Sequence, residues 1–190
     1  LGLGGLALSV MLLGVLHLLY EPTLYILLLV FLWLGNKGII ISLGRVPWLH
    51  ECLNISWRSF HFWLIALIAL GVAINLTRAL TPVHGAVDPL AYHLALPKLY
   101  LQKHHLSFEP TVTGTLYPGN IPMLYTLAIG VRGGELAQLL HFVMGMACLV
   151  FIAVFCRTYF NVKVGIWAAA FFSFTPVLVF FSPLGYIDAG

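Results

Sequence analysis

Long apolar runs separated by short polar stretches dominate the chain and predict its main elements. A helix that crosses a bilayer needs about 20 consecutive, mostly apolar residues. Five runs approach this length, over residues 3–20, 22–43, 60–80, 135–156 and 164–182. In the second run Asn36-Lys37-Gly38 interrupts the pattern, so its helix either continues or ends near Lys37. The pattern predicts an all-α integral membrane protein, with one domain (residues 1–190) built as a polytopic transmembrane helix bundle.

The composition indicates that the solvent of these helices is lipid. Hydrophobic residues make up 61% of the chain and charged residues only 8%, whereas soluble domains carry about 45–50% apolar and about 25% charged residues. Because so few charges cannot cover a surface that faces water, the lipid bilayer is the first expected partner. The net charge of +3 is small, and no basic run exceeds a dipeptide, so a nucleic-acid partner is not expected.

The loop between the third and fourth runs, residues 81–134, is the only long one. Loops of this length are usually functional or disordered, and its many Leu, Tyr and Pro residues argue against disorder. Lys and Arg are denser in the loops 36–59 and 157–163, which are therefore expected to be cytoplasmic. The long loop would then lie outside, and Asp88 and Asp188, the two aspartates of the chain, would share that outer side.

The start of the segment 88–100 is predicted to form a short helix in this loop. Asp88 followed by Pro89 is typical of an N-cap with Pro at the first helical position. Leu90, Leu94 and Leu96 give the segment an apolar face suited to the membrane interface. The long outer loop is therefore expected to form short amphipathic juxtamembrane helices.

The same segment carries a group of polar side chains. Tyr92 lies one turn from Asp88, and His93 is near enough to share a pocket if the helix is irregular there. This group consists of a base (Asp88), two hydrogen-bond donors (Tyr92 and His93) and a cation (Lys98), all beside lipid. Each residue also has a purely structural interpretation: a helix cap for Asp88, an interfacial ring for His93 and a snorkelling side chain for Lys98.

Asp188 follows a segment that is expected to break the fifth helix. Thr175-Pro176 and Ser182-Pro183 interrupt the helix and turn the chain back, which would hold Asp188 near the mouth of the bundle. Ionisable residues at or inside a membrane helix are costly and are treated as functional hypotheses. A capping or interfacial carboxylate is the alternative for Asp188.

Metal binding and histidine roles are less defined by the sequence. His104-His105 offer two ligands for a metal, but the residues around them do not complete a ligand set. His141 in the fourth run is expected to be a packed, hydrogen-bonded side chain rather than a ligand. If a divalent metal ion is used at all, Asp188 is the residue expected to hold it.

Four segments of the second half of the chain form a pattern. They are the run Asp88 to Tyr100, the run Tyr117 to Leu127, the stretch Ala137-Gln138-Leu139-Leu140-His141-Phe142, and Thr175-Pro176 leading to Tyr186-Ile187-Asp188. In this order they resemble the polytopic glycosyltransferases of the GT-C superfamily, with protein O-mannosyltransferases and aminoarabinose transferases as the nearest group. The resemblance covers residues 88–190, and the first three runs are generic.

The resemblance implies about a dozen membrane helices in the whole protein, of which this chain would be the N-terminal part. It implies transfer of a sugar from a polyprenyl-phosphate carrier to a lipid, glycan or protein acceptor, on the outer side of a bacterial inner membrane. Asp88 and Asp188 would be the catalytic carboxylates, with Tyr92, His93, Lys98 and Asn120 binding substrate. The family often carries an acidic pair at this site, whereas here the neighbours of Asp88 are Val87 and Pro89. Because of this departure, the resemblance does not define the acceptor or the metal requirement.

Two other functions fit an apolar chain with a few ionisable residues. A transporter or flippase would carry charges near the bilayer midplane and inverted repeats, whereas here the centres of the apolar runs hold almost no ionisable residue. A non-catalytic scaffold subunit of a membrane complex would tolerate replacement of Asp88 and Asp188.

Overall fold

The computed structural model describes residues 2–43, 55–82, 87–112, 115 and 119–186, and these residues form helices and connecting turns without a β-strand. The predicted all-α class is confirmed for this part of the chain. The helices are α1 (Gly2–Val15), α2 (Glu21–Leu43), α4 (Phe60–Ala79), the π-helix η1 (Pro89–His93), α5 (Ala95–Lys103), α6 (Asn120–Arg132), α7 (Gly134–Tyr159), α8 (Val162–Ser173) and α9 (Pro176–Phe181).

Two of the described helices, α4 and α7, are long and apolar enough to cross a membrane. In the most apolar 18 residues of each helix, only 11% of α4 and 22% of α7 are buried inside the structure. A core helix of a soluble protein would be mostly buried, whereas here large side chains such as Trp63 and Phe151 are more than 60% exposed. The apolar outer faces of α4 and α7 indicate association with a membrane.

Of the other three predicted spans, the one over residues 22–43 matches its expected bounds within one residue, and two differ. The helix expected over residues 3–20 ends at Val15, because the chain turns there and His17 adopts a left-handed conformation with φ of 60°. The backbone of α2 stays helical through Asn36-Lys37-Gly38 and reaches Leu43. The run 164–182 forms two helices, α8 and α9, since Pro176 cannot continue the hydrogen-bond pattern of α8.

Local sequence signals account for several helix boundaries. Ser59 begins α4 by accepting a hydrogen bond from the backbone N–H of His61 at 3.3 Å. Asn161 begins α8 in the same way, accepting from the N–H of Val164 at 3.0 Å. Both are side chains preferred at N-caps, because their oxygen satisfies an N–H that the helix leaves open.

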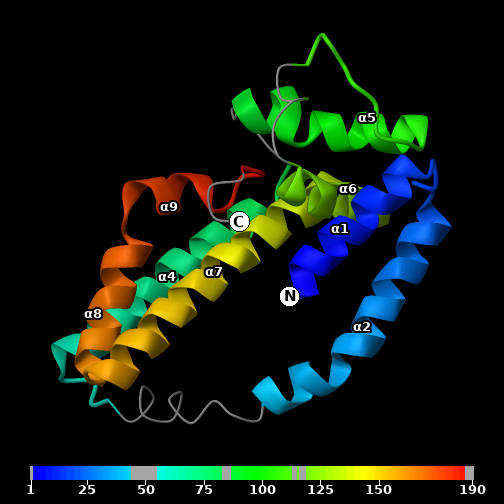
Figure 1. Ribbon diagram of the computed structural model, residues 1–190. Helices are drawn as coiled ribbons and strands as arrows, with labels where there is room; N and C mark the ends of the chain where they lie inside the picture. The colour runs from blue at the N-terminus through cyan, green and yellow to red at the C-terminus, as the bar shows by residue number, and fades with distance from the viewer. Residues whose placement is uncertain (1, 44–54, 83–86, 113–114, 116–118, 187–190) are drawn as a thin grey trace.

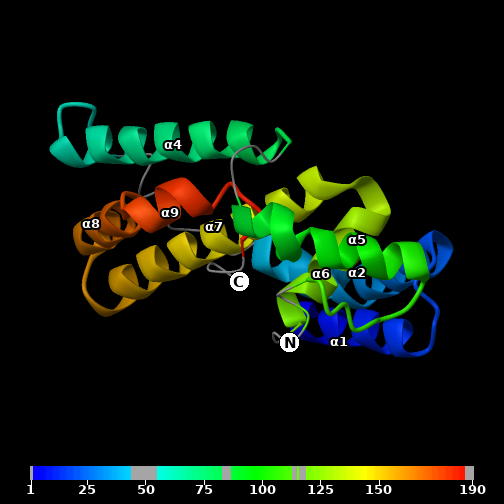
Figure 2. The same ribbon diagram turned by 90° about the horizontal axis from the view of Figure 1, so that it is seen from above.

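The helices form two groups, seen side by side from above in Figure 2. One group contains α4, α7, α8 and α9, and the other contains α1, α2, α5 and α6. Helix α6 packs on both α1 and α7 and thereby joins the groups. Helix α5 lies across the upper end of the second group (Figure 1).

The face of α5 that was expected to meet the membrane interface packs against protein instead. Leu96 and Tyr100 are buried in a cluster with residues of α1 and α6, while Leu94 packs with Tyr125 of α6. Leu90 alone of the three predicted leucines stays largely exposed, at 54%. The short helices of the loop are therefore present, but their apolar residues mainly anchor them to the bundle.

Candidate functional site

The helix that follows Asp88 is a π-helix rather than the expected α-helix. Its characteristic bond joins the N–H of Leu94 to the carbonyl of Pro89 at 2.9 Å. Single π turns inside α-helices are frequent at functional sites. A π turn is wider than an α turn. It is the kind of irregularity that His93 needs if it is to share a pocket with Asp88.

Asp88 stands at the N-cap position of η1, with Pro89 next to it, as the sequence predicts. Its side chain, however, makes no capping hydrogen bond, and its own backbone is helical, with φ of −64° and ψ of −44°. The interpretation of Asp88 as a helix-capping side chain is therefore wrong. The carboxylate is partly exposed, so capping does not explain why an acid stands at this position.

His93 is buried among aromatic rings. It is 5% exposed, and its ring centroid lies 4.2 Å from that of Tyr92 and 6.1 Å from that of Tyr186. The ring is therefore packed inside the protein, and its alternative interpretation as an interfacial ring with a structural partner stays open. Together with Tyr125 of α6, these rings form what we call the aromatic seam: Tyr92, His93, Tyr125 and Tyr186.

Three helices hold the chain segment that leads to Asp188, each through a backbone carbonyl. Arg78 of α4 donates to the carbonyl of Val179 at 2.9 Å, and Nδ1 of His141 in α7 lies 3.2 Å from the carbonyl of Ser182. The hydroxyl of Tyr125 donates to the carbonyl of Tyr186. The fully buried His141 thus confirms the expectation of a packed, hydrogen-bonded histidine.

The segment is also fitted closely against η1. A Cβ atom at Gly185 would lie 3.1 Å from a methyl carbon of Leu94, the residue that ends η1. The ring of Tyr186 contacts both His93 and, at 4.6 Å between centroids, Phe181. The structure therefore brings the approach to Asp188 against the helix that carries Asp88, while Asp188 itself lies outside the described residues.

Replacing Tyr125 by Phe is expected to lower the free energy of unfolding by about 2 kcal/mol, because the carbonyl of Tyr186 loses its donor in a buried place. The measurement is thermal unfolding of the full-length protein in detergent. Tyr25→Phe is the matched control, since it removes a hydroxyl that donates to the carbonyl of Val131 at 3.0 Å from an exposed position. Equal effects of the two substitutions would contradict a special role for the seam.

Two predicted substrate-binding residues are not joined to the seam. Lys98 is exposed on α5, and Asn120 is exposed at the first position of α6. Among the described residues, neither side chain makes a hydrogen bond or an ion pair to η1. Their assignment as substrate-binding residues stays a prediction.

The paired histidines of α5 have structural contacts. The ring of His104 stacks on Tyr20 at 4.1 Å and its Nδ1 lies 3.0 Å from the carbonyl of Leu19. His105 stacks on His17 at 4.5 Å. The two histidines fasten the end of α5 to the turn between α1 and α2. Within the described ranges no group of three or more His, Cys, Asp or Glu could hold a metal ion, and metal binding by Asp188 is untested.

Sequence reasoning missed three residues of this region. Arg78 is a single cation in the last turn of an apolar helix, and Tyr125 sits in an apolar stretch of α6. Gln138 is 1% exposed and donates to the carbonyl of Thr81 at 3.0 Å, while its Oε1 atom accepts no hydrogen bond from the described residues. The available signal was a polar residue inside an otherwise apolar run, which in a membrane helix needs a partner.

A second polar cluster fixes the loop after α5. Glu109 accepts hydrogen bonds from Lys103 and from Ser107, and the ion pair with Lys103 is the one recorded among the described residues. The hydrogen bond from Lys103, and next that from Ser107, lower the pKa of Glu109 below its usual 4.5. Burial raises the pKa of the nearby Tyr100 hydroxyl, and the charge of Glu109 adds to this rise.

The lowered pKa of Glu109 predicts a pH-dependent loop. Because the folded state favours the charged carboxylate, the stabilisation is complete above about pH 4.5 and is lost as the pH falls through the lowered pKa. We expect amide exchange in residues 103–112 to rise at that point, measured by hydrogen–deuterium exchange with correction for intrinsic rates. Lys103→Gln should raise exchange at neutral pH and move the step towards pH 4.5, because the hydrogen bond from Ser107 alone then lowers the pKa of Glu109. A step at the same pH as in the wild type would contradict this assignment.

Comparisons of the chain with protein-family models, curated proteins and solved structures gave no match. The function must therefore be argued from the residues and their arrangement.

Proposed function

We propose that this chain belongs to a polytopic membrane glycosyltransferase that moves a sugar from a polyprenyl-phosphate carrier to an acceptor on the outer face of the membrane. Asp88 is the catalytic base, and Asp188 supports the same site. The five apolar segments, α1, α2, α4, α7 and the α8–α9 pair, form part of its transmembrane bundle.

The observation that carries the proposal is the contact between His93 and Tyr186. It joins η1, which begins after Asp88, to a segment that ends two residues before Asp188, although about 100 residues separate the two aspartates. Chain segments so distant in sequence are packed together here by a buried histidine, a π turn and three hydrogen-bonded carbonyls. Ligand sites in helical membrane proteins gather at such irregular helix ends.

The residues present fit glycosyl transfer to a hydroxyl. The acceptor oxygen forms a bond to the anomeric carbon as the bond from that carbon to the carrier phosphate breaks, and the phosphate leaves with both bonding electrons. The acceptor proton passes to the Asp88 carboxylate, the role of a general base. Tyr92, His93 and Lys98 would orient the substrates and stabilise the charge that develops on the leaving phosphate.

The test is a transfer assay with the full-length protein in proteoliposomes and a panel of radiolabelled polyprenyl-phosphate sugars. We expect one donor to release its sugar, either to an added acceptor or to water, with free polyprenyl phosphate as the second product. Lipid-linked sugars with the same head on a phosphatidyl tail serve as the control for carrier recognition. Absence of turnover with every donor would overturn the proposal and favour a transporter or a scaffold subunit.

A further inference from the structure

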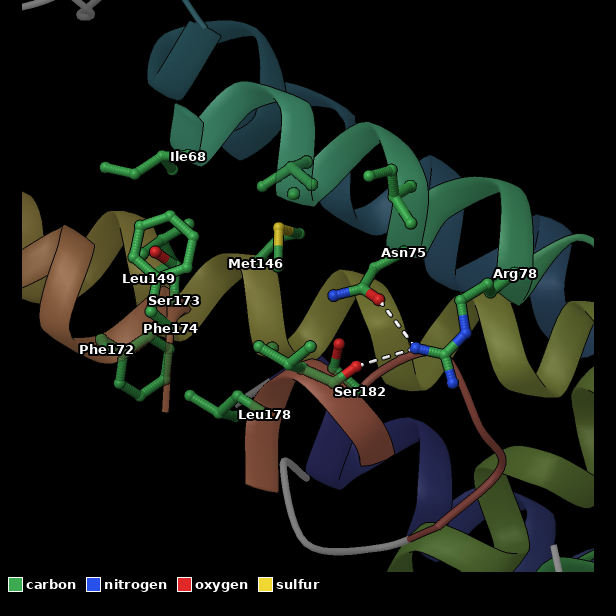
Figure 3. Close-up of a pocket in the computed structure, with 15 residues that line it drawn as sticks. Ile68, Asn75, Arg78, Met146, Leu149, Phe172, Ser173, Phe174, Leu178 and Ser182 are labelled. Atoms are coloured by element: carbon green, nitrogen blue, oxygen red, sulfur yellow. Dashed lines mark hydrogen bonds between the residues drawn. The ribbon is translucent and has the colours of Figure 1, made fainter. Parts of the chain in front are cut away.

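A cavity of about 160 Å³ lies inside the first helix group, between α4, α7, α8 and α9. Its wall is almost entirely apolar, with side chains such as Ile68, Leu149 and Phe174 at one end (Figure 3). Arg78 and Asn75 of α4 lie at the other end, together with Ser182. The cavity is therefore a hydrocarbon-like space that ends in a cation.

The volume and the surroundings of the cavity suit part of one hydrocarbon chain. An apolar protein cavity of about 150 Å³ is large enough for a benzene ring. Two of the lining side chains, Ile74 and Phe174, are 52% and 41% exposed, so the cavity opens to the outside of the helix group. That outside is the same apolar face of α4 that indicates membrane association.

Arg78 has donors left for a ligand at the polar end. Its Nη1 donates to Oδ1 of Asn75 at 3.2 Å and to the carbonyl of Val179 at 2.9 Å. These two neutral acceptors fix the guanidinium without neutralising it, and within the described ranges it has no carboxylate partner. A guanidinium presents N–H groups on all three nitrogens. Those on Nη2 and Nε have no acceptor among the residues that the structure describes, and they can donate to an anionic ligand.

The depth of Arg78 along α4 matches that of a lipid headgroup. A helix of 20 residues such as α4 is about 30 Å long, which equals the hydrocarbon thickness of a bilayer. Arg78 is in its last turn. If α4 spans the membrane, its guanidinium lies at the level of the phosphate groups while the cavity lies in the hydrocarbon below.

We infer that the cavity between α4, α7, α8 and α9 is a lipid site, in which Arg78 binds the phosphate of the headgroup and the apolar wall binds one chain. The shared chemistry is a phosphate on a long hydrocarbon chain, which both an anionic phospholipid and a polyprenyl phosphate provide. The site is separate from Asp88 and the aromatic seam, and it does not depend on the proposed transferase activity.

The experiment is native mass spectrometry of delipidated full-length protein titrated with three lipids: phosphatidylglycerol, phosphatidylcholine with identical chains, and a short polyprenyl phosphate. Arg78→Gln removes the cation and retains side-chain donors. Gly71→Leu fills the cavity, because a Cβ there meets only the ring of Phe174, at 3.9 Å. It should also fold well, since Leu favours a helix more than Gly does.

Matched controls make the same substitutions elsewhere. Arg132→Gln removes an exposed cation from the last turn of α6. Gly4→Leu adds a side chain to an exposed position of α1 where a Cβ has no neighbour within 4 Å. Neither control residue lines the cavity.

We expect Arg78→Gln to weaken the binding of phosphatidylglycerol about tenfold, the equivalent of one charge-assisted hydrogen bond. It should weaken the binding of phosphatidylcholine less, because the choline cation offsets the charge of the same phosphate. Gly71→Leu should weaken the binding of every lipid that uses the cavity. Both control variants should bind the lipids as the wild type does. The source of the phosphate is whichever of phosphatidylglycerol and polyprenyl phosphate binds more tightly in an Arg78-dependent way. The inference would be overturned if Arg78→Gln bound both phosphatidylglycerol and polyprenyl phosphate as tightly as the wild type does. It would also be overturned if Gly71→Leu bound the lipids as tightly as Gly4→Leu does.

Discussion

Replacing Asp88 by Asn is expected to lower the rate of sugar transfer by about 10²–10⁴-fold, the usual contribution of a positioned general base. Asn has nearly the same shape as Asp but cannot accept a proton. Asp88 makes no capping hydrogen bond in η1, so the substitution should leave the helix and the overall stability unchanged. The measurement is the initial rate of transfer in proteoliposomes with the donor that the wild-type protein uses.

The control for this substitution is Glu109→Gln, which neutralises another acid of the same long loop, residues 81–134. Glu109 pairs with Lys103 at the end of α5 and takes no part in the aromatic seam. The pair fixes the loop after α5 and contacts neither η1 nor the described part of the segment before Asp188, so the transfer rate should stay close to that of the wild type. Equal rates for Asp88→Asn and wild type, at equal folded amounts, would remove Asp88 from the site.

Replacing Gly165 by Leu is expected to destabilise the protein by about 3 kcal/mol, because the new side chain has no space between α7 and α8. A Cβ at this position would lie 2.8 Å from the backbone carbonyl oxygen of Ala153 and 3.3 Å from the Cβ of Arg157. The oxygen belongs to the backbone of α7 and cannot swing aside. Small residues permit such close approach of helices in membranes.

The measurement is thermal unfolding of the full-length protein in detergent, where a loss of this size corresponds to roughly 6–12 °C. Gly4→Leu is the control, since its position on α1 has no neighbour within 4 Å of a Cβ. The two variants share the gain in helix propensity that follows from replacing Gly. A similar unfolding temperature for both would show that α7 and α8 can separate without cost.

The apolar pattern predicted the ends of α2, α4 and α7 to within three residues, because a long succession of apolar positions has one low-energy backbone state away from water. It predicted the spans 3–20 and 164–182 less well. Whether residues 16–20 continue α1 depends on the turn at His17 and on the docking of His104 and His105 there. These contacts join positions about 85 residues apart, which a local pattern does not contain.

The candidate site, like the fold, was predicted by the sequence only in part. The sequence pointed to the segment 88–100, because polar residues inside an apolar chain are costly unless they have a role or a partner. That His93 shares a pocket with Asp88 was predicted only on the condition that the helix is irregular there. It did not show that Asp88 leaves its helix uncapped, or that Arg78, Tyr125 and His141 each bind one carbonyl of the segment before Asp188.

The sequence by itself determined that this chain is helical and that its long helices are apolar on every side. Both properties follow from composition and spacing, which act residue by residue through backbone hydrogen bonding and transfer out of water. The tertiary structure alone decided that η1 meets Tyr186, that Leu94 and Leu96 face protein, and that a cavity ends at Arg78. These are relations between distant segments, and they depend on which helix faces fit together, a choice that side-chain shape and packing make only when all the helices are present.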